Sequence, residues 1–197
     1  MSPRPCHILL VRHARTDWNV TGRRQSHRDV PLDDVGLAMA RALAEHGPFH
    51  GVSAIYTSDL ARAAQTAAPI AERLGLTPRP DMRLRESRAE PAPCETYPVL
   101  PFPLEQESAE HVTARMVQCL DEIVRRHAGE RVAVVSHGGA IRRFLGAVIG
   151  GYQTPPAVTN TALCHLEHDA GQWSAPRLFD CDHLQRAGLA TASQDAG

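Results

Sequence analysis

Apolar residues occur along the chain in two kinds of run, and the first kind is short. Runs of about four to eight apolar residues that end at polar or turn-forming residues indicate strands. Residues 8–11 and 132–136 are the clearest cases, because they contain almost no polar side chain. The predicted strands cover residues 8–11, 53–57, 132–136, 162–167 and 172–179, and the last two are expected to be antiparallel.

The second kind of run repeats at helical spacing. Between residues 60 and 74 the apolar side chains are spaced four and three residues apart, which places them on one helical face. We expect Asp59 to be the N-cap of this helix, Gly75 to end it, and Pro69 to kink it or start a new turn. The predicted helices cover residues 36–44, 60–74, 108–126 and 139–149, and residues 16–34 are predicted to be a loop.

Strands and helices alternate along most of the chain, which predicts a mainly parallel sheet covered by helices on both faces. The expected fold class is therefore α/β, a three-layer α/β/α sandwich. Residues 87–106 contain five prolines and are predicted to be the least regular part of the chain. Residues 1–184 are expected to form a single domain, and residues 185–197 a flexible C-terminal tail.

Composition is ordinary for a globular protein of 197 residues and excludes some partners. The formal net charge of −1 argues against general nucleic-acid binding. No apolar run approaches the roughly 20 residues that span a bilayer, so no membrane association is expected. The first five residues lead straight into a strand and leave no room for a signal peptide. Five cysteines without a C-x-x-C pair indicate free thiols in a reducing cytoplasm.

Basic and imidazole side chains follow two of the predicted strands directly. Arg12 and His13 follow residues 8–11, and His137 follows residues 132–136. Ligands of open α/β sheets bind beyond the carboxyl ends of the strands, so these side chains are placed to meet an anion. Residues 12–28 also contain five arginines and one acid, Asp17. This basic stretch is either a solvated loop face or the rim of an anion site.

Three separate motifs carry a family resemblance. Residues 10–13 are Leu-Val-Arg-His, residues 57–67 are Thr-Ser-Asp-Leu-Ala-Arg-Ala-Ala-Gln-Thr-Ala, and residues 134–139 are Val-Val-Ser-His-Gly-Gly. Together and in this order they closely resemble the histidine phosphatase superfamily, the phosphoglycerate-mutase-like proteins. The resemblance extends from about residue 6 to about residue 184 and implies a phosphoglycerate-mutase-like fold.

The resemblance also implies a site. His13 matches the family histidine that is transiently phosphorylated, and a neutral imidazole is a suitable nucleophile near neutral pH. Glu86 matches the family's general acid. The other catalytic and phosphate-binding residues that the resemblance implies are Arg12, Asn19, Arg62, His137 and the amide of Gly138, with Gln25 and Ser26 at the position where the family commonly has Gln-Gly.

Alternatives remain for individual residues. Glu86 lies among Arg83, Arg85 and Arg88 in the sequence, so its carboxylate could simply pair with them. Arg15 stands where the family usually has Glu, and we hypothesise that it contacts a second anionic group of the substrate together with Arg24 or Arg28. No metal site and no cofactor are expected, since the sequence contains no metal-binding motif.

The function implied is that of a metal-independent phosphatase that hydrolyses a small phosphorylated metabolite through phosphohistidine. Residues 87–106 would then be a lid over the active site. A phosphomutase of the same superfamily is the main alternative, and a phosphoprotein phosphatase or a non-catalytic phosphate-binding module are further ones. The expected partner is a small-molecule phosphate ester in the cytoplasm, with a homodimer as a candidate assembly.

Overall fold

The computed structural model describes residues 4–104, 106–149 and 158–189. Its centre is a six-stranded sheet with the strand order β3-β2-β4-β1-β5-β6. Strands β1 to β4 run parallel to one another, and β5 pairs antiparallel with both β1 and β6. The strands are β1 Cys6–Arg12, β2 Val52–Thr57, β3 Arg79–Pro80, β4 Arg131–Ser136, β5 Leu163–Asp169 and β6 Gln172–Asp180.

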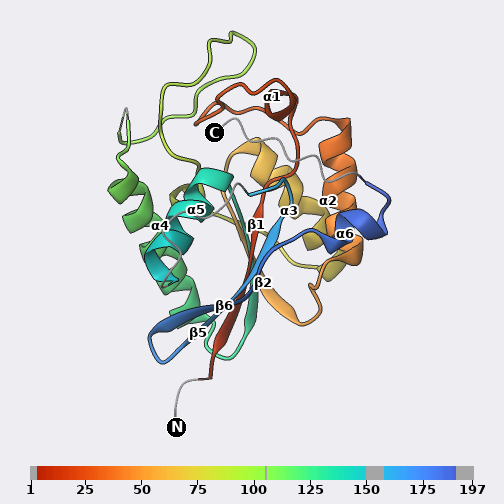
Figure 1. Cartoon of the computed structure of the whole chain (residues 1–197), viewed down its shortest axis with the longest axis vertical. Helices are drawn as coiled ribbons and strands as arrows, with labels where there is room; N and C mark the ends of the chain where they lie inside the picture. The colour runs from red at the N-terminus through yellow and green to blue at the C-terminus, as the bar shows by residue number, and fades with distance from the viewer. Residues whose placement is uncertain (1–3, 105, 150–157, 190–197) are drawn as a thin grey trace.

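Helices cover both faces of this sheet. Figure 1 shows α4 and α5 on one side, and α2, α3 and α6 on the other. This arrangement confirms the predicted three-layer sandwich. The helices are α1 Asp17–Val20, α2 Asp34–His46, α3 Ala61–Leu74, α4 Ala109–Arg126, α5 Gly138–Val148 and α6 Asp182–Arg186, and a 3₁₀ turn, η1, covers Met82–Leu84.

Strand β1 divides its side chains between the two halves of the core. Ile8 and Leu10 pack with apolar residues of α4 and α5, whereas Leu9 and Val11 pack with residues of α2 and α3. All four side chains are buried, because successive side chains of a strand point to opposite faces and both faces are covered. The buried strand therefore fixes where its carboxyl end, and the polar residues that follow it, lie.

The start of α3 differs from the prediction. The N-cap is Leu60, which makes no side-chain capping bond, and not Asp59. Asp59 instead pairs with Arg85, with both carboxylate oxygens 2.6 Å from the guanidinium. Asp29, from the loop before α2, accepts a hydrogen bond from the Ala61 amide at 2.6 Å. The helix runs through Pro69, and Gly75 ends it with φ +66°, as predicted.

The segment 87–104 contains no helix or strand beyond one isolated bridge, which agrees with its irregular prediction. It is nevertheless tied to residues 23–29. Arg28 donates to the carbonyls of Cys94 and Tyr97, both at 2.6 Å, and Arg23 donates to that of Pro93 at 2.6 Å. The tip of the molecule above the carboxyl end of β1 is built from these two stretches (Figure 1).

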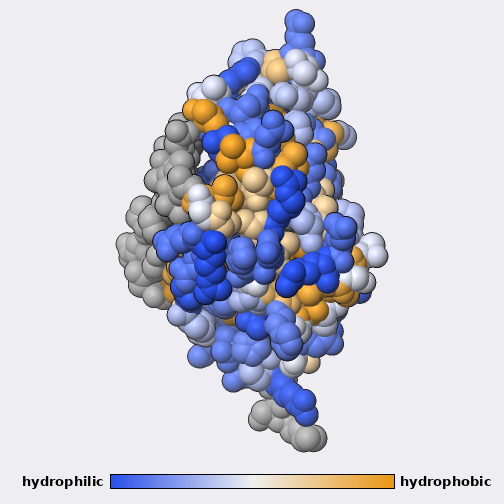
Figure 2. Space-filling view, turned by 90° about the vertical axis from the view of Figure 1, so that its right-hand side faces the viewer, coloured by the Kyte–Doolittle hydropathy of each residue, from blue (hydrophilic) through white to orange (hydrophobic). Residues whose placement is uncertain are grey.

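Regular structure continues past residue 184, the predicted end of the domain, and Leu189 still packs against the cluster that contains Leu184. Helix α6 ends at Arg186, and Leu184 is fully buried against residues of α2. Of the predicted tail, residues 190–197 lie outside the described residues. The face that carries α2 and α6 is mainly hydrophilic, with a smaller central area of exposed apolar residues (Figure 2). Within the described ranges, no helix combines the length and the apolarity that crossing a membrane requires.

Candidate active site

The two predicted histidines meet at one edge of the sheet. Strands β1 and β4 are parallel neighbours whose register pairs Arg12 with Ser136, so His13 and His137 follow at the same level. Their ring centroids lie 5.1 Å apart. Both side chains are buried.

His13 is held in the tautomer that a nucleophile needs. Its Nδ1 lies 2.7 Å from the carbonyl oxygen of Ala14, which can only accept, so Nδ1 carries the proton. Nε2 therefore keeps its lone pair. Burial, and then the positive charges of Arg62 and Arg12, lower the pKa of His13 well below its ordinary value of 6.5. The imidazole is consequently neutral at pH 7.

Arg62 projects from the first turn of α3 and is fully buried. Its guanidinium donates to the carbonyls of Arg28 at 2.9 Å and Ser26 at 2.8 Å. Burial lowers its pKa to about 10, which leaves it cationic at neutral pH. Arg12, at the end of β1, donates to the carbonyl of Val158. Three backbone carbonyls from two loops thus fix two positive charges beside His13.

His137 is anchored through one ring nitrogen. Nε2 lies 2.9 Å from the hydroxyl of Ser58, the residue that follows β2. Its Nδ1 is buried and has no hydrogen-bond partner in the ranges that the structure describes. Burial, and next the charge of Arg62, lower the pKa of His137 well below 6.5. A buried ring nitrogen without a partner beside the nucleophile can bind an oxygen atom of a ligand.

The Glu86 carboxylate accepts hydrogen bonds from two backbone amides. Oε2 accepts from the amide of Gly139, in the first turn of α5, at 2.9 Å, and Oε1 accepts from the amide of Ser87 at 2.8 Å. Arg83 pairs with Asp81 and Glu122, and Arg85 pairs with Asp59. The simple pairing of Glu86 with these two arginines is therefore wrong, and the carboxylate is available at the site.

A cavity of about 880 Å³ is lined by Arg12, His13, Arg62 and Glu86. His137 lies directly beside His13 but is not among the described residues that line the cavity. Among the described residues, its walls carry six arginines and one carboxylate. The lining residues that were predicted for the site are Arg12, His13, Asn19, Gln25, Ser26, Arg62, Glu86 and Gly138. Arg23 and Arg24, from the basic stretch 12–28, also line the cavity. The remaining lining residues were not predicted for the site and are Ser87, Ala89, Thr113, Gly139, Arg142, Arg143, Gly146, Ala147 and Val158.

Arg15 lies away from this cavity. Its Nε is 2.9 Å from Asp33, and it does not belong to the described residues that line the cavity. In this arrangement Arg15 does not reach the cavity, because its side chain is drawn to the N-cap carboxylate of α2, and its contact with a substrate stays an untested prediction. Arg24 does line the cavity, whereas Arg28 is occupied with the carbonyls of residues 94 and 97.

Ser26 adopts φ +47°, the left-handed region in which glycine is the usual residue. Its hydroxyl donates to the carbonyl of Ser87 at 3.3 Å and accepts from the amide of Ala89 at 3.0 Å. The serine thus links the loop to the segment that follows Glu86. Gln25 lines the cavity, and its buried Oε1 has no partner in the described part of the chain.

Asn160 is a site residue that sequence reasoning missed. Its Nδ2 lies 3.1 Å from the carbonyl oxygen of His13 and 3.3 Å from Oδ1 of Asn19. Asn19 completes the capping box of α1, since its side chain accepts from the amide of the N-cap residue Thr16. The one signal in the sequence is that Asn160 stands just before the predicted strand 162–167. In the structure this strand, β5, pairs antiparallel with β1, which brings the buried Asn160 beside His13.

The sequence pattern of the histidine phosphatase superfamily (branch 1) matches residues 8–92 and 88–180 of this chain. The chain belongs to the histidine phosphatase superfamily. It is 36% identical over 207 residues to the metal-independent phosphoserine phosphatase of Arabidopsis thaliana, covering 92% of this chain and 84% of that protein. It is 30% identical over 204 residues to phosphoglycerate mutase-like protein 4 of the same plant, covering 92% and 88%.

The fold of the chain is also similar to that of a solved structure. Bacillus stearothermophilus YhfR superimposes with a TM-score of 0.80 at 27% identity, covering 91% of this chain and 99% of that chain. Both phosphatases and phosphoglycerate mutase-like proteins are thus among its relatives, so the chain is a member of a superfamily of phosphatase and phosphomutase enzymes.

Gly139→Ala tests whether the position of Glu86 matters for activity. A Cβ at residue 139 would lie 2.5 Å from Oε1 of Glu86, so the carboxylate must move. We expect kcat/KM for phosphate esters to fall by about tenfold or more. Gly75→Ala is the control, because its Cβ would meet no atom within 4 Å. It should lose about 1 kcal/mol of stability through its positive φ but keep kcat/KM unchanged. Equal kcat/KM in both variants would contradict this role of Glu86.

Stability should fall when the pH drops below 6.5. His13, His137, His27 and His183 all have a pKa below that value in the folded protein, with His27 and His183 at about 4. The unfolded chain therefore binds protons first, and each histidine contributes a slope of up to about 1.4 kcal/mol per pH unit. Urea unfolding between pH 7 and pH 4 measures it. His183→Gln should make the slope shallower.

Proposed function

We propose that this chain is a metal-independent phosphatase that hydrolyses a small phosphate monoester through a phosphohistidine at His13. The observation that carries the proposal is the neutral His13 imidazole, with Nδ1 occupied by a carbonyl and two buried guanidiniums beside it. A group that attacks phosphorus needs a lone pair, and the phosphoryl oxygens need fixed positive charge.

The first chemical step transfers the phosphoryl group to the protein. Nε2 of His13 forms a bond to phosphorus while the bond from phosphorus to the ester oxygen breaks. Arg12, Arg62 and His137 bind the phosphoryl oxygens, with the amide of Gly138 at the start of α5. The electron pair of the broken bond goes to the leaving oxygen, which takes a proton from Glu86.

The second step releases phosphate. Glu86, now a carboxylate, accepts a proton from water as the water oxygen bonds to phosphorus. The bond between phosphorus and Nε2 breaks, and its electron pair returns to the His13 ring. Glu86 then holds the proton for the next cycle. This route uses groups of the protein and water alone, and the similarity to the metal-independent phosphoserine phosphatase of Arabidopsis supports it.

Phosphomutase activity is the second candidate. The name of the phosphoglycerate mutase-like relative favours it. The short stretch between Glu86 and α4 favours hydrolysis, because a mutase must shield its phosphoryl enzyme from water until the second alcohol binds. We infer further that the protein acts in the cytoplasm, where its five free cysteines would stay reduced. A phosphoprotein substrate and a homodimer remain proposals of lower rank.

Four further arginines line the same cavity as His13, Arg12 and Arg62, and they favour a substrate that carries negative charge besides its phosphate group. Arg23, Arg24, Arg142 and Arg143 line the cavity, and in the part of the chain that the structure describes Glu86 contributes its one carboxylate. Arginine presents a planar, permanently charged group to anionic oxygens. A small phosphorylated acid fits these walls better than a neutral sugar or alcohol ester does.

The central test is phosphate release from p-nitrophenyl phosphate in the presence of EDTA. The unaltered protein should release phosphate at the same rate with and without EDTA, since no step uses a metal. His13→Ala should lower kcat by about a thousandfold or more, because the nucleophile is lost. Activity that persists in His13→Ala would exclude the phosphohistidine route.

Incubation with 3-phosphoglycerate separates the candidates. Isomerisation without net release of phosphate would establish a mutase, and no turnover of any ester in a panel of phosphorylated metabolites would leave a binding module.

Charge at the cavity wall can be tested with esters of different charge. Arg24→Gln and Arg143→Gln should each raise KM for phosphoserine by about fivefold, the order expected for one exposed charge pair, and affect p-nitrophenyl phosphate less. Arg15→Gln is the matched control, because its side chain pairs with Asp33 outside the cavity. If Arg15→Gln raises KM for phosphoserine as much as the other two, the cavity arginines have no special role.

A further inference from the structure

Glu86 is fixed although it lies outside every helix and strand. It follows the short turn η1, and the residues after it are irregular. Its carboxylate receives hydrogen bonds from the amides of Ser87 and Gly139. These two bonds orient the carboxylate only as long as the backbone around residue 86 stays in place relative to α5. The backbone must therefore be held by other groups.

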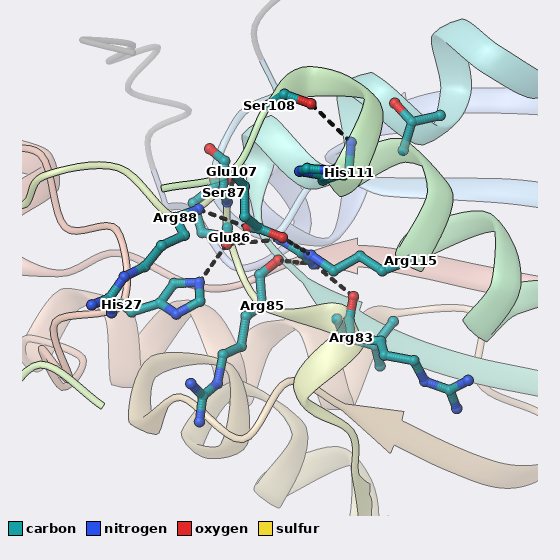
Figure 3. Close-up of polar contacts among 12 residues, drawn as sticks. His27, Arg83, Arg85, Glu86, Ser87, Arg88, Glu107, Ser108, His111 and Arg115 are labelled. Atoms are coloured by element: carbon teal, nitrogen blue, oxygen red, sulfur yellow. Dashed lines mark hydrogen bonds and ion pairs between the residues drawn. The ribbon is translucent and has the colours of Figure 1, made fainter. Parts of the chain in front are cut away.

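Arg115 of α4 holds this backbone from one side. Its Nη1 donates to the carbonyls of Arg83 and Arg85, both at 2.7 Å, and its Nη2 donates to the carbonyl of Glu86 at 2.9 Å. His27 donates to the same Glu86 carbonyl from the opposite side, with Nε2 at 2.8 Å (Figure 3). The carbonyl oxygen of Glu86 thus has two donors from different parts of the chain.

Glu107 fixes Arg115 in turn. The pair is bidentate, with Nε 2.7 Å from Oε1 and Nη2 2.9 Å from Oε2. The Arg88 amide donates to the same Oε2 at 2.8 Å, and the amide of Glu107 donates to the carbonyl of Arg88 at 2.9 Å. The exposed fractions of the two side chains are 1% for Glu107 and 10% for Arg115. One buried ion pair therefore binds the backbone both before and after Glu86.

A buried ion pair is a poor means of gaining stability, since two charges must lose their hydration to form it. Its geometry, in contrast, is well defined, because a bidentate pair restricts both distance and angle. We propose that the Glu107–Arg115 pair, together with His27, positions the Glu86 carboxyl for proton transfer to the leaving group. The inference rests on the proposed phosphatase function. It assigns a positioning role in catalysis to three residues that do not touch the reacting atoms.

The role has a chemical signature in the leaving group. A leaving phenolate takes its proton from Glu86 as the bond from oxygen to phosphorus breaks, whereas a dinitrophenolate is stable without one. Loss of a well-placed proton donor must therefore slow phenyl phosphate much more than 2,4-dinitrophenyl phosphate. A general loss of structure would slow both esters by the same factor. The parameter to compare is kcat/KM, which covers the steps up to phosphoryl transfer to His13 and excludes the later hydrolysis.

The experiment uses the double variant Glu107→Leu/Arg115→Met, which removes both charges and so leaves neither one buried alone. Its kcat/KM is measured with phenyl, p-nitrophenyl and 2,4-dinitrophenyl phosphate. We expect the loss on phenyl phosphate to exceed the loss on the dinitrophenyl ester by about tenfold or more, the pattern also expected of Glu86→Gln. Arg115→Lys, which cannot reach all three carbonyls, should lie between. The control, Arg125→Met, replaces an exposed arginine of the same helix and should change neither value.

Each outcome decides the matter. An equal loss on all three esters, while Glu86→Gln discriminates between them, overturns the positioning role and leaves the phosphatase proposal intact. No turnover of any ester by the unaltered protein overturns the proposed function and this inference with it. If the double variant does not fold, Glu107→Gln replaces it, since the amide keeps an acceptor for Arg115, and the same comparison of esters applies.

Discussion

The site depends on one imidazole that stays uncharged beside guanidiniums that stay charged. Burial produces the first condition and opposes the second. His13 loses hydration and faces two positive charges, so its protonated form is disfavoured and its lone pair remains available. Arg62 loses hydration as well, but carbonyls of the neighbouring loop accept its hydrogen bonds, and its pKa of about 10 keeps it cationic. An anion that enters the cavity finds a nucleophile and its counter-charges already in place.

The sheet brings these groups together because parallel neighbouring strands end at the same edge. Strand β1 delivers Arg12 and His13, β4 delivers His137, and the turn after β2 delivers Ser58, which holds the His137 ring. The strands are buried on both faces, and a one-residue slip in register would send each side chain to the opposite half of the core. The rigid sheet therefore positions the phosphate-binding half of the site, whereas Glu86 comes from an irregular segment that side chains must hold.

The sequence predicts what depends on local pattern and fails where distant partners decide. Apolar runs locate the central strands and long helices, since burial on one or two faces imposes a period on the residues themselves. The N-cap prediction for Asp59 fails because Asp59 forms an ion pair with Arg85, and the pair of Arg15 with Asp33 has no local signal either, since both partners are remote in the sequence. The two histidines that the family resemblance singles out lie side by side at one edge of the sheet. The contacts of Arg115 with three carbonyls have no counterpart in any local pattern.

The central claim is that His13 itself becomes phosphorylated, and intact-protein mass spectrometry after rapid alkaline quenching tests it most directly. Alkaline conditions preserve the acid-labile bond between phosphorus and nitrogen. During turnover of p-nitrophenyl phosphate, the account predicts a protein heavier by one phosphoryl group, with the added mass on the peptide that contains His13 and absent from His13→Ala. Phosphorylation of a different residue, or continued turnover by His13→Ala, would contradict it.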